Sequence, residues 1–246
     1  HDPNGYTNDC HGWDFYHNDN SVFDAPDGDD HGTHVAGTNA AIANNNQGIA
    51  GVSPGVTILP LKFLGPNGGA TSDAITAIQY AKDRGVHIIN CSWGGGAYSQ
   101  ALRDAIANSG ILFTVASGNS SANIQNVPQY PAAYDLSNVV TVAAVDNQGD
   151  LASFSNYGGN TAVGAPGVDI LSTTPRRPTS TIAVDRTTSG YRTGYWGFGL
   201  EAVVGASNRR DLLTAELNHL GATINSPIVV VDDDDRAAGV GGAVDE

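Results

Sequence analysis

Short apolar runs alternate with amphipathic stretches along much of the chain, and this alternation most constrains its fold. The runs at 86–91, 111–116 and 138–145 are mostly apolar without strict alternation, as expected of strands that are buried on both faces. Two stretches have helical spacing: 72–84 precedes the first run and 99–109 lies between the first and the second, and each is followed directly by a glycine. The order strand, helix, strand, helix, strand predicts an α/β fold with a mostly parallel central sheet flanked by helices.

Two further segments extend this pattern toward the start of the chain. Residues 56–64 indicate another strand, although Pro60 within it favours a sheet edge or a bulge. Residues 32–43 are small and apolar, which favours a tightly packed helix. Ligands of open parallel sheets bind outside the carboxyl ends of the strands, so we expect a site at the loops 92–96 and 117–120. Ser72-Asp73 is expected to cap the helix over 72–84.

Composition narrows the function classes. The 246 residues include 25 acids against 11 bases, a formal net charge of −14. Such a surface repels nucleic acids and anionic membranes, so we expect neither as a partner. No apolar run approaches the ~18 residues of a membrane span. The chain begins with His1 and contains no methionine, so we expect it to be processed or incomplete at its front.

The two cysteines are Cys10 and Cys91. They are too few for a disulfide framework or a zinc site. Cys91 ends an apolar run, which favours a small buried side chain over a reactive thiol. A single bridge between the two cysteines stays open.

Charge is distributed differently before and after residue 175. All acids in 1–175 are Asp, whereas 176–246 carry every Glu and no Lys. This change indicates a boundary, either of a domain or of sequence origin. The second part contains a helical stretch at 209–219 and a strand-like run at 228–231. The acids at 232–235 are interpreted as a solvated, self-repelling segment rather than a cation site.

One stretch carries the most specific motif, Asp29-Asp30-His31-Gly32-Thr33-His34-Val35-Ala36-Gly37-Thr38. A metal site formed by His31 and His34 lacks the intervening glutamate of a zinc protease. Taken alone, two packed or solvated histidines are the default interpretation. Other motifs follow downstream, however, in a fixed order: 44–54, 90–95, 116–119, 130–134, and 154–158 with 165–170.

In this order the motifs resemble those of the subtilisin-like serine proteases, the subtilases of peptidase family S8. The resemblance extends over residues 29–172 and implies a subtilisin-like fold in 1–175. It implies a secreted, monomeric, calcium-stabilised serine endopeptidase that cleaves protein or peptide substrates through an acyl-enzyme. The alternative is a catalytically inactive subtilase-like fragment or a peptide-binding module. The segment 176–246 matches no part of the family, and a foreign or frameshifted origin stays open for it.

The resemblance assigns roles to individual residues. His31 is the general base, and Asn119 is the amide that hydrogen-bonds the developing oxyanion. Loss of one such donor typically costs ~2.7–4 kcal/mol of transition-state stabilisation. Extended substrate pairs with the backbone of one strand, which gives affinity with little side-chain selectivity. The residues implied to bind substrate are Ser92, Trp93, Gly94, Ala116 and Gly118.

The resemblance also implies calcium, which takes six to eight oxygen ligands. One implied site uses the Asn45 side chain and the carbonyls of Ala43, Gln47 and Ile49, with a carboxylate that should precede residue 1. A second candidate is an Asp/Asn-rich loop near the start, for which a solvated turn is the alternative. Its candidate ligands are Asp2, Asn4, Asn8 and Asp9.

Two members of the catalytic triad find no clear match. The family places an aspartate at the end of an apolar strand before the histidine motif, and we expect this strand to lie outside the chain. For the nucleophile, Ser189 lies at nearly the expected distance after the Ala-Pro-Gly turn, while Ser207 comes later. Without the aspartate strand, its neighbours should stay unpaired, and the chain should be marginally stable or prone to aggregate.

Overall fold

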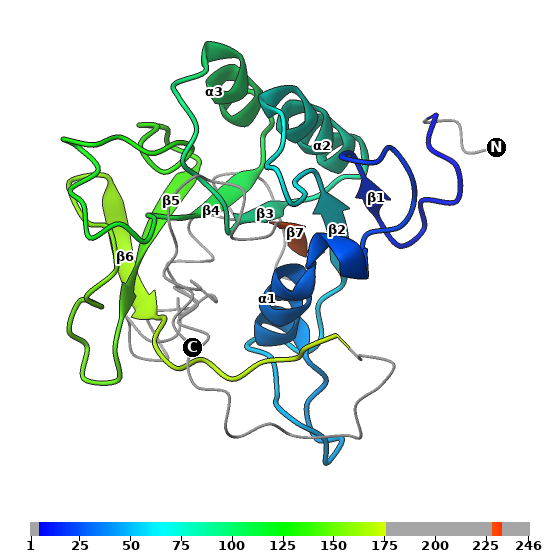
Figure 1. Cartoon of the computed structure of the whole chain (residues 1–246), viewed down its shortest axis with the longest axis horizontal. Coiled ribbons are helices and arrows are strands. Elements are labelled where there is room, and N and C mark those ends of the chain that lie inside the picture. Colours follow the sequence, from blue (N-terminus) through cyan, green and yellow to red (C-terminus); the bar gives the residue numbers. More distant parts are fainter. Residues whose placement is uncertain (1–4, 176–227, 233–246) are drawn as a thin grey trace.

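A parallel sheet runs through the computed structural model, which describes residues 5–175 and, in backbone, residues 228–232 (Figure 1). Within these residues the sheet has seven strands in the order β1-β2-β7-β3-β4-β5-β6, and every neighbouring pair is parallel. The predicted α/β fold is therefore confirmed. The strands are β1 (Trp13–Asp14), β2 (Ile58–Lys62), β3 (Ile88–Cys91), β4 (Leu112–Ala116), β5 (Val139–Val145), β6 (Thr161–Pro166) and β7 (Ile228–Asp232).

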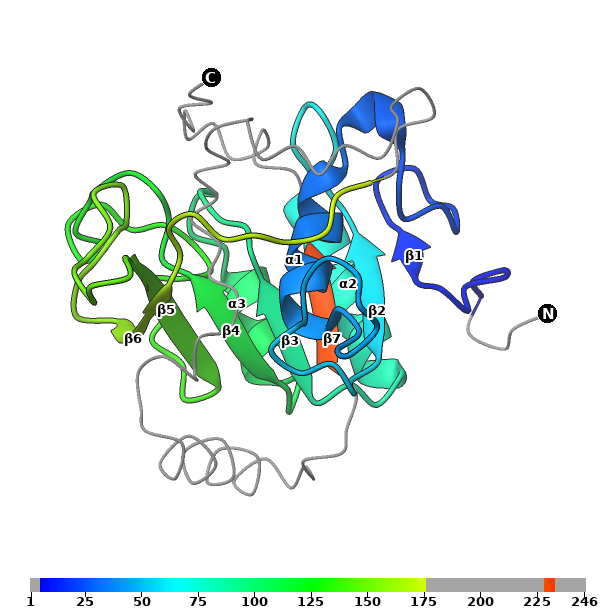
Figure 2. The same ribbon diagram turned by 90° about the horizontal axis from the view of Figure 1, so that it is seen from below.

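Helices cover both faces of the sheet (Figures 1 and 2). On one face lie α2 (Thr71–Asp83) and α3 (Gln100–Ala107), and on the other lies α1 (Asp30–Ala40). The face under α2 and α3 carries the larger core, in which Ile89 and Phe113 are completely buried. The α1 face has a smaller core around Val35. A short 3-10 helix, Ala25–Asp27, precedes α1.

Helix α1 is packed closely against the segment that follows β6. A Cβ atom at Gly37 would overlap the side chains of Ser172 and Thr173, so this position requires glycine. Thr173 Oγ1 also donates a hydrogen bond to the carbonyl oxygen of Thr33, at 2.6 Å. The small residues of the predicted helix therefore permit a close approach of two backbone segments.

The predicted elements that lie within the described residues agree with the observed ones to within three residues at each end, with one cap misassigned. Ser99 caps α3, because its side chain accepts a hydrogen bond from Leu102 N at 3.2 Å. The prediction that Ser72-Asp73 caps α2 is wrong: the N-cap residue is Ala70. Ser72 instead donates a hydrogen bond to the carboxylate of Asp73, at 3.2 Å.

Pro60 lies inside β2 but opposes no residue of β1. Strand β1 pairs only with Leu61 and Lys62 of β2. The edge of β2 that faces β1 is therefore unpaired at Pro60. A proline has no backbone N–H, and such an edge does not require one. The predicted edge position is therefore correct locally, although β2 as a whole lies between two strands.

The centre of the sheet corrects an expectation. Strands β2 and β3 are not left unpaired: β7 lies between them and is parallel to both (Figure 2). Its register places Ile228 opposite Ile58 and Ile88. The strand-like run at 228–231 is thus confirmed as a strand, and it fills the position that was expected to be empty. The helical stretch at 209–219 lies outside the described residues.

Candidate active site

His31 is the second residue of α1 and is buried, with 8% of its surface exposed. The residue before the helix, Asp29, does not cap it with its side chain. The Asp29 carboxylate instead accepts hydrogen bonds from Asp24 N at 2.8 Å and contacts Lys62 Nζ at 2.7 Å. Because Lys62 is the last residue of β2, this ion pair fixes the start of α1 at the carboxyl edge of the sheet.

Lys62 lies at the centre of an acidic cluster that includes Asp29. Its Nζ atom lies within 3.1 Å of Asp14, 3.0 Å of Asp24 and 2.7 Å of Asp27, and its side chain is 6% exposed. Burial alone would lower the pKa of Lys62, but its hydrogen bonds to carboxylates outweigh burial and raise that pKa. Burial raises the pKa of Asp29, against the opposing influence of Lys62. The sequence motifs gave no sign of this cluster.

His34 on α1 contacts the segment that follows β6. Its Nε2 atom lies 3.2 Å from the carbonyl oxygen of Ile170, in the segment after β6. The carbonyl oxygen of His34 accepts a hydrogen bond from Thr38, at 3.1 Å. His34 therefore fastens α1 to the segment after β6.

Asn119 follows β4 in a loop whose backbone requires glycine at position 118. Gly118 has φ +106°, and a Cβ atom there would overlap the side chains of Gln129 and Asn156. Within residues 5–175, the Oδ1 atom of Asn119 is buried and has no hydrogen-bond partner. The described fold therefore does not use this oxygen to hold the loop.

The loop is held instead by Asn156, which is completely buried. Asn156 N donates to Gly118 O at 2.8 Å, and its Nδ2 donates to Ser117 O at 2.9 Å. Its Oδ1 accepts hydrogen bonds from Ser120 N and Ala122 N, both at 2.9 Å. Sequence reasoning recognised the segment 154–158 as a motif but assigned this asparagine no role.

The predicted substrate-binding residues follow β3 and β4. Ser92 is buried, and its Oγ accepts a hydrogen bond from Asn90 Nδ2 at 2.7 Å. The Trp93 ring packs edge-on against Phe63, with ring centroids 4.9 Å apart. Ala116 is the last residue of β4.

The loop after β3 is also tied to a later segment. Gly95 N donates to Tyr130 O at 3.2 Å, and Gly96 forms an isolated bridge with the same residue. Gly94 lies beside this carbonyl oxygen as well, because a Cβ atom there would stand 3.4 Å from it. The loop 92–96 is therefore fixed rather than free at the carboxyl end of β3.

Three of the predicted residues lie at the carboxyl edge of the sheet. Parallel strands end at the same edge, so Ser92 after β3 and Asn119 after β4 lie at the edge where Lys62 ends β2. The Lys62–Asp29 ion pair brings the start of α1, with His31, to that edge. Ser189 lies outside the described residues and its role stays a prediction.

The implied calcium ligands are only partly described. Asn45 and Gln47 lie in an exposed loop after α1, where Asn45 Oδ1 accepts a hydrogen bond from Gln47 N at 3.0 Å. This loop, with Ala43 and Ile49, offers an amide oxygen and backbone carbonyls, the donor type that calcium takes. These assignments stay predictions.

The second calcium candidate is described at Asn8 and Asp9, whereas Asp2 and Asn4 lie outside the described residues. Asp9 is 3% exposed and its carboxylate accepts a hydrogen bond from Tyr80 Oη at 2.7 Å. It also pairs with Arg84. Burial and the hydrogen bond to Asp9 raise the pKa of Tyr80.

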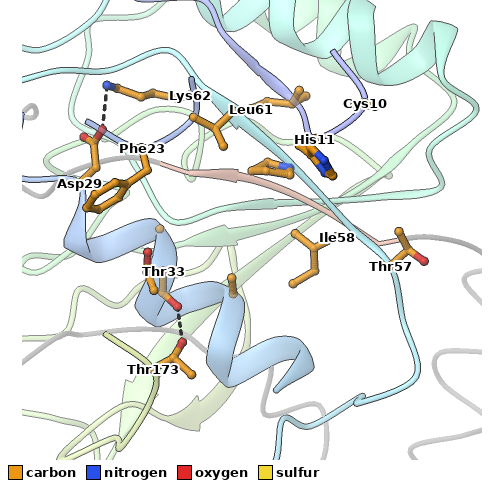
Figure 3. A pocket seen from close by; sticks show the side chains of 14 residues that line it. Cys10, His11, Phe23, Asp29, Thr33, Thr57, Ile58, Leu61, Lys62 and Thr173 are labelled. Atoms are coloured by element: carbon orange, nitrogen blue, oxygen red, sulfur yellow. Dashed lines mark hydrogen bonds and ion pairs between the residues drawn. The ribbon is translucent and has the colours of Figure 1, made fainter. Parts of the chain in front are cut away.

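A cavity of about 610 Å³ lies between α1 and β2 (Figure 3). Its lining includes Thr33 on α1, Ile58 on β2 and Phe23 from the segment before the helix. Neither His31 nor Asn119 lines it. The cavity does reach Asp29 and Lys62, so it adjoins the start of α1 without including the predicted base or oxyanion donor.

Cys10 and Cys91 are not joined by a disulfide: Cys10 is exposed and Cys91 is buried. The interpretation of Cys91 as a small buried side chain is confirmed. Among the described residues, no helix is long and apolar enough to cross a membrane.

Comparison with known proteins identifies the fold. The Subtilase family model, Peptidase_S8, matches residues 1–195. Subtilisin DY of Bacillus licheniformis is 45% identical over 154 residues, covering 61% of this chain and 55% of that protein. Thermitase of Thermoactinomyces vulgaris is 40% identical over 176 residues, covering 70% of this chain and 59% of that protein. The chain thus spans less than two thirds of the length of these relatives.

Solved structures give the same picture. Fervidolysin from Fervidobacterium pennivorans, a keratinolytic enzyme related to subtilisin, matches with a TM-score of 0.58 and 34% identity, over 68% of this chain and 26% of that one. A cold-adapted subtilisin-like serine proteinase matches with a TM-score of 0.55 and 29% identity, over 69% of this chain and 62% of that one. The family model, the relatives and the architecture agree, and the chain belongs to the subtilase family.

Proposed function

We propose that this chain carries the catalytic core of a serine endopeptidase that hydrolyses peptide bonds in protein substrates through an acyl-enzyme. The observation that carries the proposal is the arrangement at the carboxyl edge of the sheet. His31 begins a helix that is tied to the end of β2, and Asn119 lies in the loop after β4. A general base and an oxyanion donor on separate rigid elements are the parts that acyl transfer requires.

Each residue has a distinct step. His31 takes the proton from the hydroxyl of the nucleophilic serine and returns it to the leaving amine. The side-chain amide of Asn119 donates a hydrogen bond to the oxyanion, while extended substrate pairs with the backbone of 92–94. We assign the nucleophile to Ser189, on the sequence argument alone.

The rigidity of the oxyanion loop supports this mechanism. Oxyanion stabilisation is effective when the donor is fixed before the charge develops, because no reorganisation is then needed. Asn156 fixes the backbone on both sides of Asn119 through four hydrogen bonds of 2.8–2.9 Å. The loop is therefore preorganised without involving the Asn119 side chain.

We further infer that the protease is a secreted monomer that binds calcium through Asn45 and the carbonyls of Ala43, Gln47 and Ile49. The oxygen-rich, exposed loop after α1 supports the calcium assignment. The acidic composition, with 25 acids against 11 bases, is compatible with secretion.

Labelling with a fluorophosphonate tests the function. The full chain should be modified at one serine, which peptide mapping should locate at Ser189. The His31→Ala variant should lose the label, since the hydroxyl then has no base. His11→Ala, which removes an exposed histidine, should keep it. Absence of any adduct in the folded wild-type chain would contradict the proposal and favour an inactive peptide-binding module.

A further inference from the structure

The cavity between α1 and β2 contains neither His31 nor Asn119, so the proposed endopeptidase mechanism does not use it (Figure 3). Its volume is about 610 Å³. Pockets for small molecules have volumes of roughly 300–1,000 Å³ and mostly apolar walls that carry a few polar groups. The apolar lining residues in the described part of the chain are Val22, Phe23, Ala36, Ile58, Pro60 and Leu61. The size and the lining are therefore those of a small-molecule site.

Phe23 leaves part of an aromatic ring available at this cavity. It lies just before the 3-10 helix Ala25–Asp27, and 39% of its surface is exposed. Figure 3 shows Phe23, Asp29 and Lys62 toward one end of the cavity and Thr57 toward the other. Covering an exposed aromatic ring with an apolar group is favourable, because apolar surface then leaves water. The apolar part of a ligand is therefore expected near the end that also carries the charged side chains.

Asp29 gives the cavity wall a carboxylate oxygen that accepts no hydrogen bond from the described residues. Its side chain is 10% exposed. Asp24 N, at 2.8 Å, and Lys62 Nζ, at 2.7 Å, both approach its Oδ2 atom, and no group in the described part of the chain donates to Oδ1. A buried acceptor without a donor carries the full cost of its lost hydration. A ligand that places a donor in the cavity beside Asp29 removes that cost.

The charge at this end of the cavity favours a cation. Asp14, Asp24, Asp27 and Asp29 all lie within 3.1 Å of Lys62 Nζ. Four negative charges against one positive charge leave this group with a formal net charge of −3. Burial raises the pKa of Asp29 although Lys62 opposes this, so the negative charge of Asp29 is incompletely compensated. A cation that enters the cavity is attracted there, and an anion is repelled.

Neither an anion nor a bare metal ion suits this cavity. Lys62 also lines it, but its Nζ atom already contacts four carboxylates, which would repel an anion placed beside it. Calcium takes six to eight oxygen ligands. Among the described residues, Asp29 alone supplies carboxylate oxygens to the cavity wall. A metal ion would also leave the ring of Phe23 uncovered.

We propose that this cavity binds a small organic cation, a primary ammonium that carries an aromatic or aliphatic group. The ammonium donates a hydrogen bond to Asp29 Oδ1, and its charge is balanced by the acidic excess around Lys62. The apolar group lies against Phe23, between Ala36 on α1 and Ile58 on β2. The site does not depend on the proposed endopeptidase function, because binding is measured directly.

Three probes of similar shape test the charge of the ligand on the unaltered full chain. A ligand-detected NMR titration should show binding of 2-phenylethylammonium at millimolar concentration. The neutral 2-phenylethanol should bind about tenfold more weakly or less, because it cannot make a charge-assisted hydrogen bond. The anion 3-phenylpropanoate should not bind measurably. Equal affinity for the ammonium and the alcohol would overturn the proposal, and so would the absence of ammonium binding.

Asp29→Asn tests the contact with the ammonium. Asparagine keeps the size of the side chain and removes its charge, so the affinity for 2-phenylethylammonium should fall about tenfold or more. Asp24→Asn is the matched control, because Asp24 contacts Lys62 Nζ at 3.0 Å but does not line the cavity. It should weaken binding by about threefold at most, since its charge acts only at a distance. Equal losses in the two variants would overturn the contact with Asp29.

Phe23→Ala locates the apolar group of the ligand and also decides the question if Asp29→Asn does not fold. Phe23 is partly exposed, so its removal is compatible with folding, and the affinity for 2-phenylethylammonium should fall several-fold. Tyr157→Ala is the control, because Tyr157 is 44% exposed and does not line the cavity. Weaker binding in Phe23→Ala alone supports the site. Unchanged binding in Phe23→Ala, or an equal loss in Tyr157→Ala, would overturn it.

Discussion

The two sides of the proposed active site are held by different interactions. The loop after β4, with Asn119, is fixed by hydrogen bonds of the neutral side chain of Asn156. The start of α1, with His31, is fixed by an ammonium among four carboxylates. Hydrogen bonds between neutral groups change little in strength with pH or salt concentration. The stability of a buried charge cluster, by contrast, depends on every charged member being present. Changes in pH or salt concentration should therefore affect the start of α1 more than the loop after β4.

Removing the central cation should have the largest effect. Lys62→Met leaves four carboxylates in a buried cluster without their partner, which should lower the free energy of unfolding by about 3–5 kcal/mol. Urea unfolding measures this loss. Lys82→Met, which removes an exposed lysine, is the control and should change stability little.

The pH dependence of the stability loss in Lys62→Met distinguishes an effect of charge from an effect of packing. The pKa of Lys62 is raised, so its contribution in the wild type is fully present below the unfolded value of about 10.4 and is lost only as pH rises through the folded value. In Lys62→Met the deficit should shrink as pH falls through the raised pKa of Asp29, because protonation then neutralises that buried carboxylate. A deficit that is constant between pH 7 and pH 4 would show that packing, not charge, dominates.

Calcium should stabilise the loop that follows α1, at the end of the helix opposite the charge cluster. A ligand bound only to the native state at 100 times its Kd adds about 2.7 kcal/mol to stability. Addition of a chelator should therefore lower Tm, and readdition of calcium should restore it. In Asn45→Ala the response to chelator should be smaller, and an unchanged wild-type Tm would refute calcium binding.

Asn156→Ala tests the loop after β4, which is held by hydrogen bonds between neutral groups. It removes the acceptor of Ser120 N and Ala122 N and the donor to Ser117 O, at an expected cost of about 2 kcal/mol in the free energy of unfolding. It should also lower kcat, because the oxyanion donor is no longer held. Asn126→Ala, an exposed asparagine, is the matched control. If the stability loss in Asn156→Ala depended strongly on salt concentration, the proposed difference between the loop after β4 and the start of α1 would be contradicted.

His17 should give the smallest effect. Its hydrogen bond to Asp14, at 2.8 Å, raises its pKa above 6.5. The stabilisation is thus fully present below pH 6.5 and is lost as pH rises through the folded value. Its side chain is 39% exposed, so His17→Gln should cost less than ~1 kcal/mol at pH 5.5 and nothing at pH 9. His11→Gln, at an exposed position, should show no such difference.

Local sequence patterns predicted the helices and strands well, but they did not predict which residues distant in sequence contact one another. The apolar runs around Ile89 and Phe113 became buried strands, because a strand of this kind depends on a few neighbouring residues. The cluster around Lys62 and the hydrogen bonds of Asn156 join residues that are far apart in sequence, so no local pattern records them. The position of β7 illustrates this most strongly: the run at 228–231 was recognised as strand-like, but nothing in it names its neighbours.

The central position of β7 has a consequence for biosynthesis. Strands β2 and β3 bond to each other only through β7 in the described sheet, so the sheet closes only after residues 228–232 have been made. A ribosome adds about 5–20 residues per second, which leaves the earlier strands waiting for several seconds after they emerge. Pairs this distant in sequence also close slowly. The interval exposes two apolar strand edges, and a chaperone that covers them would act during that time.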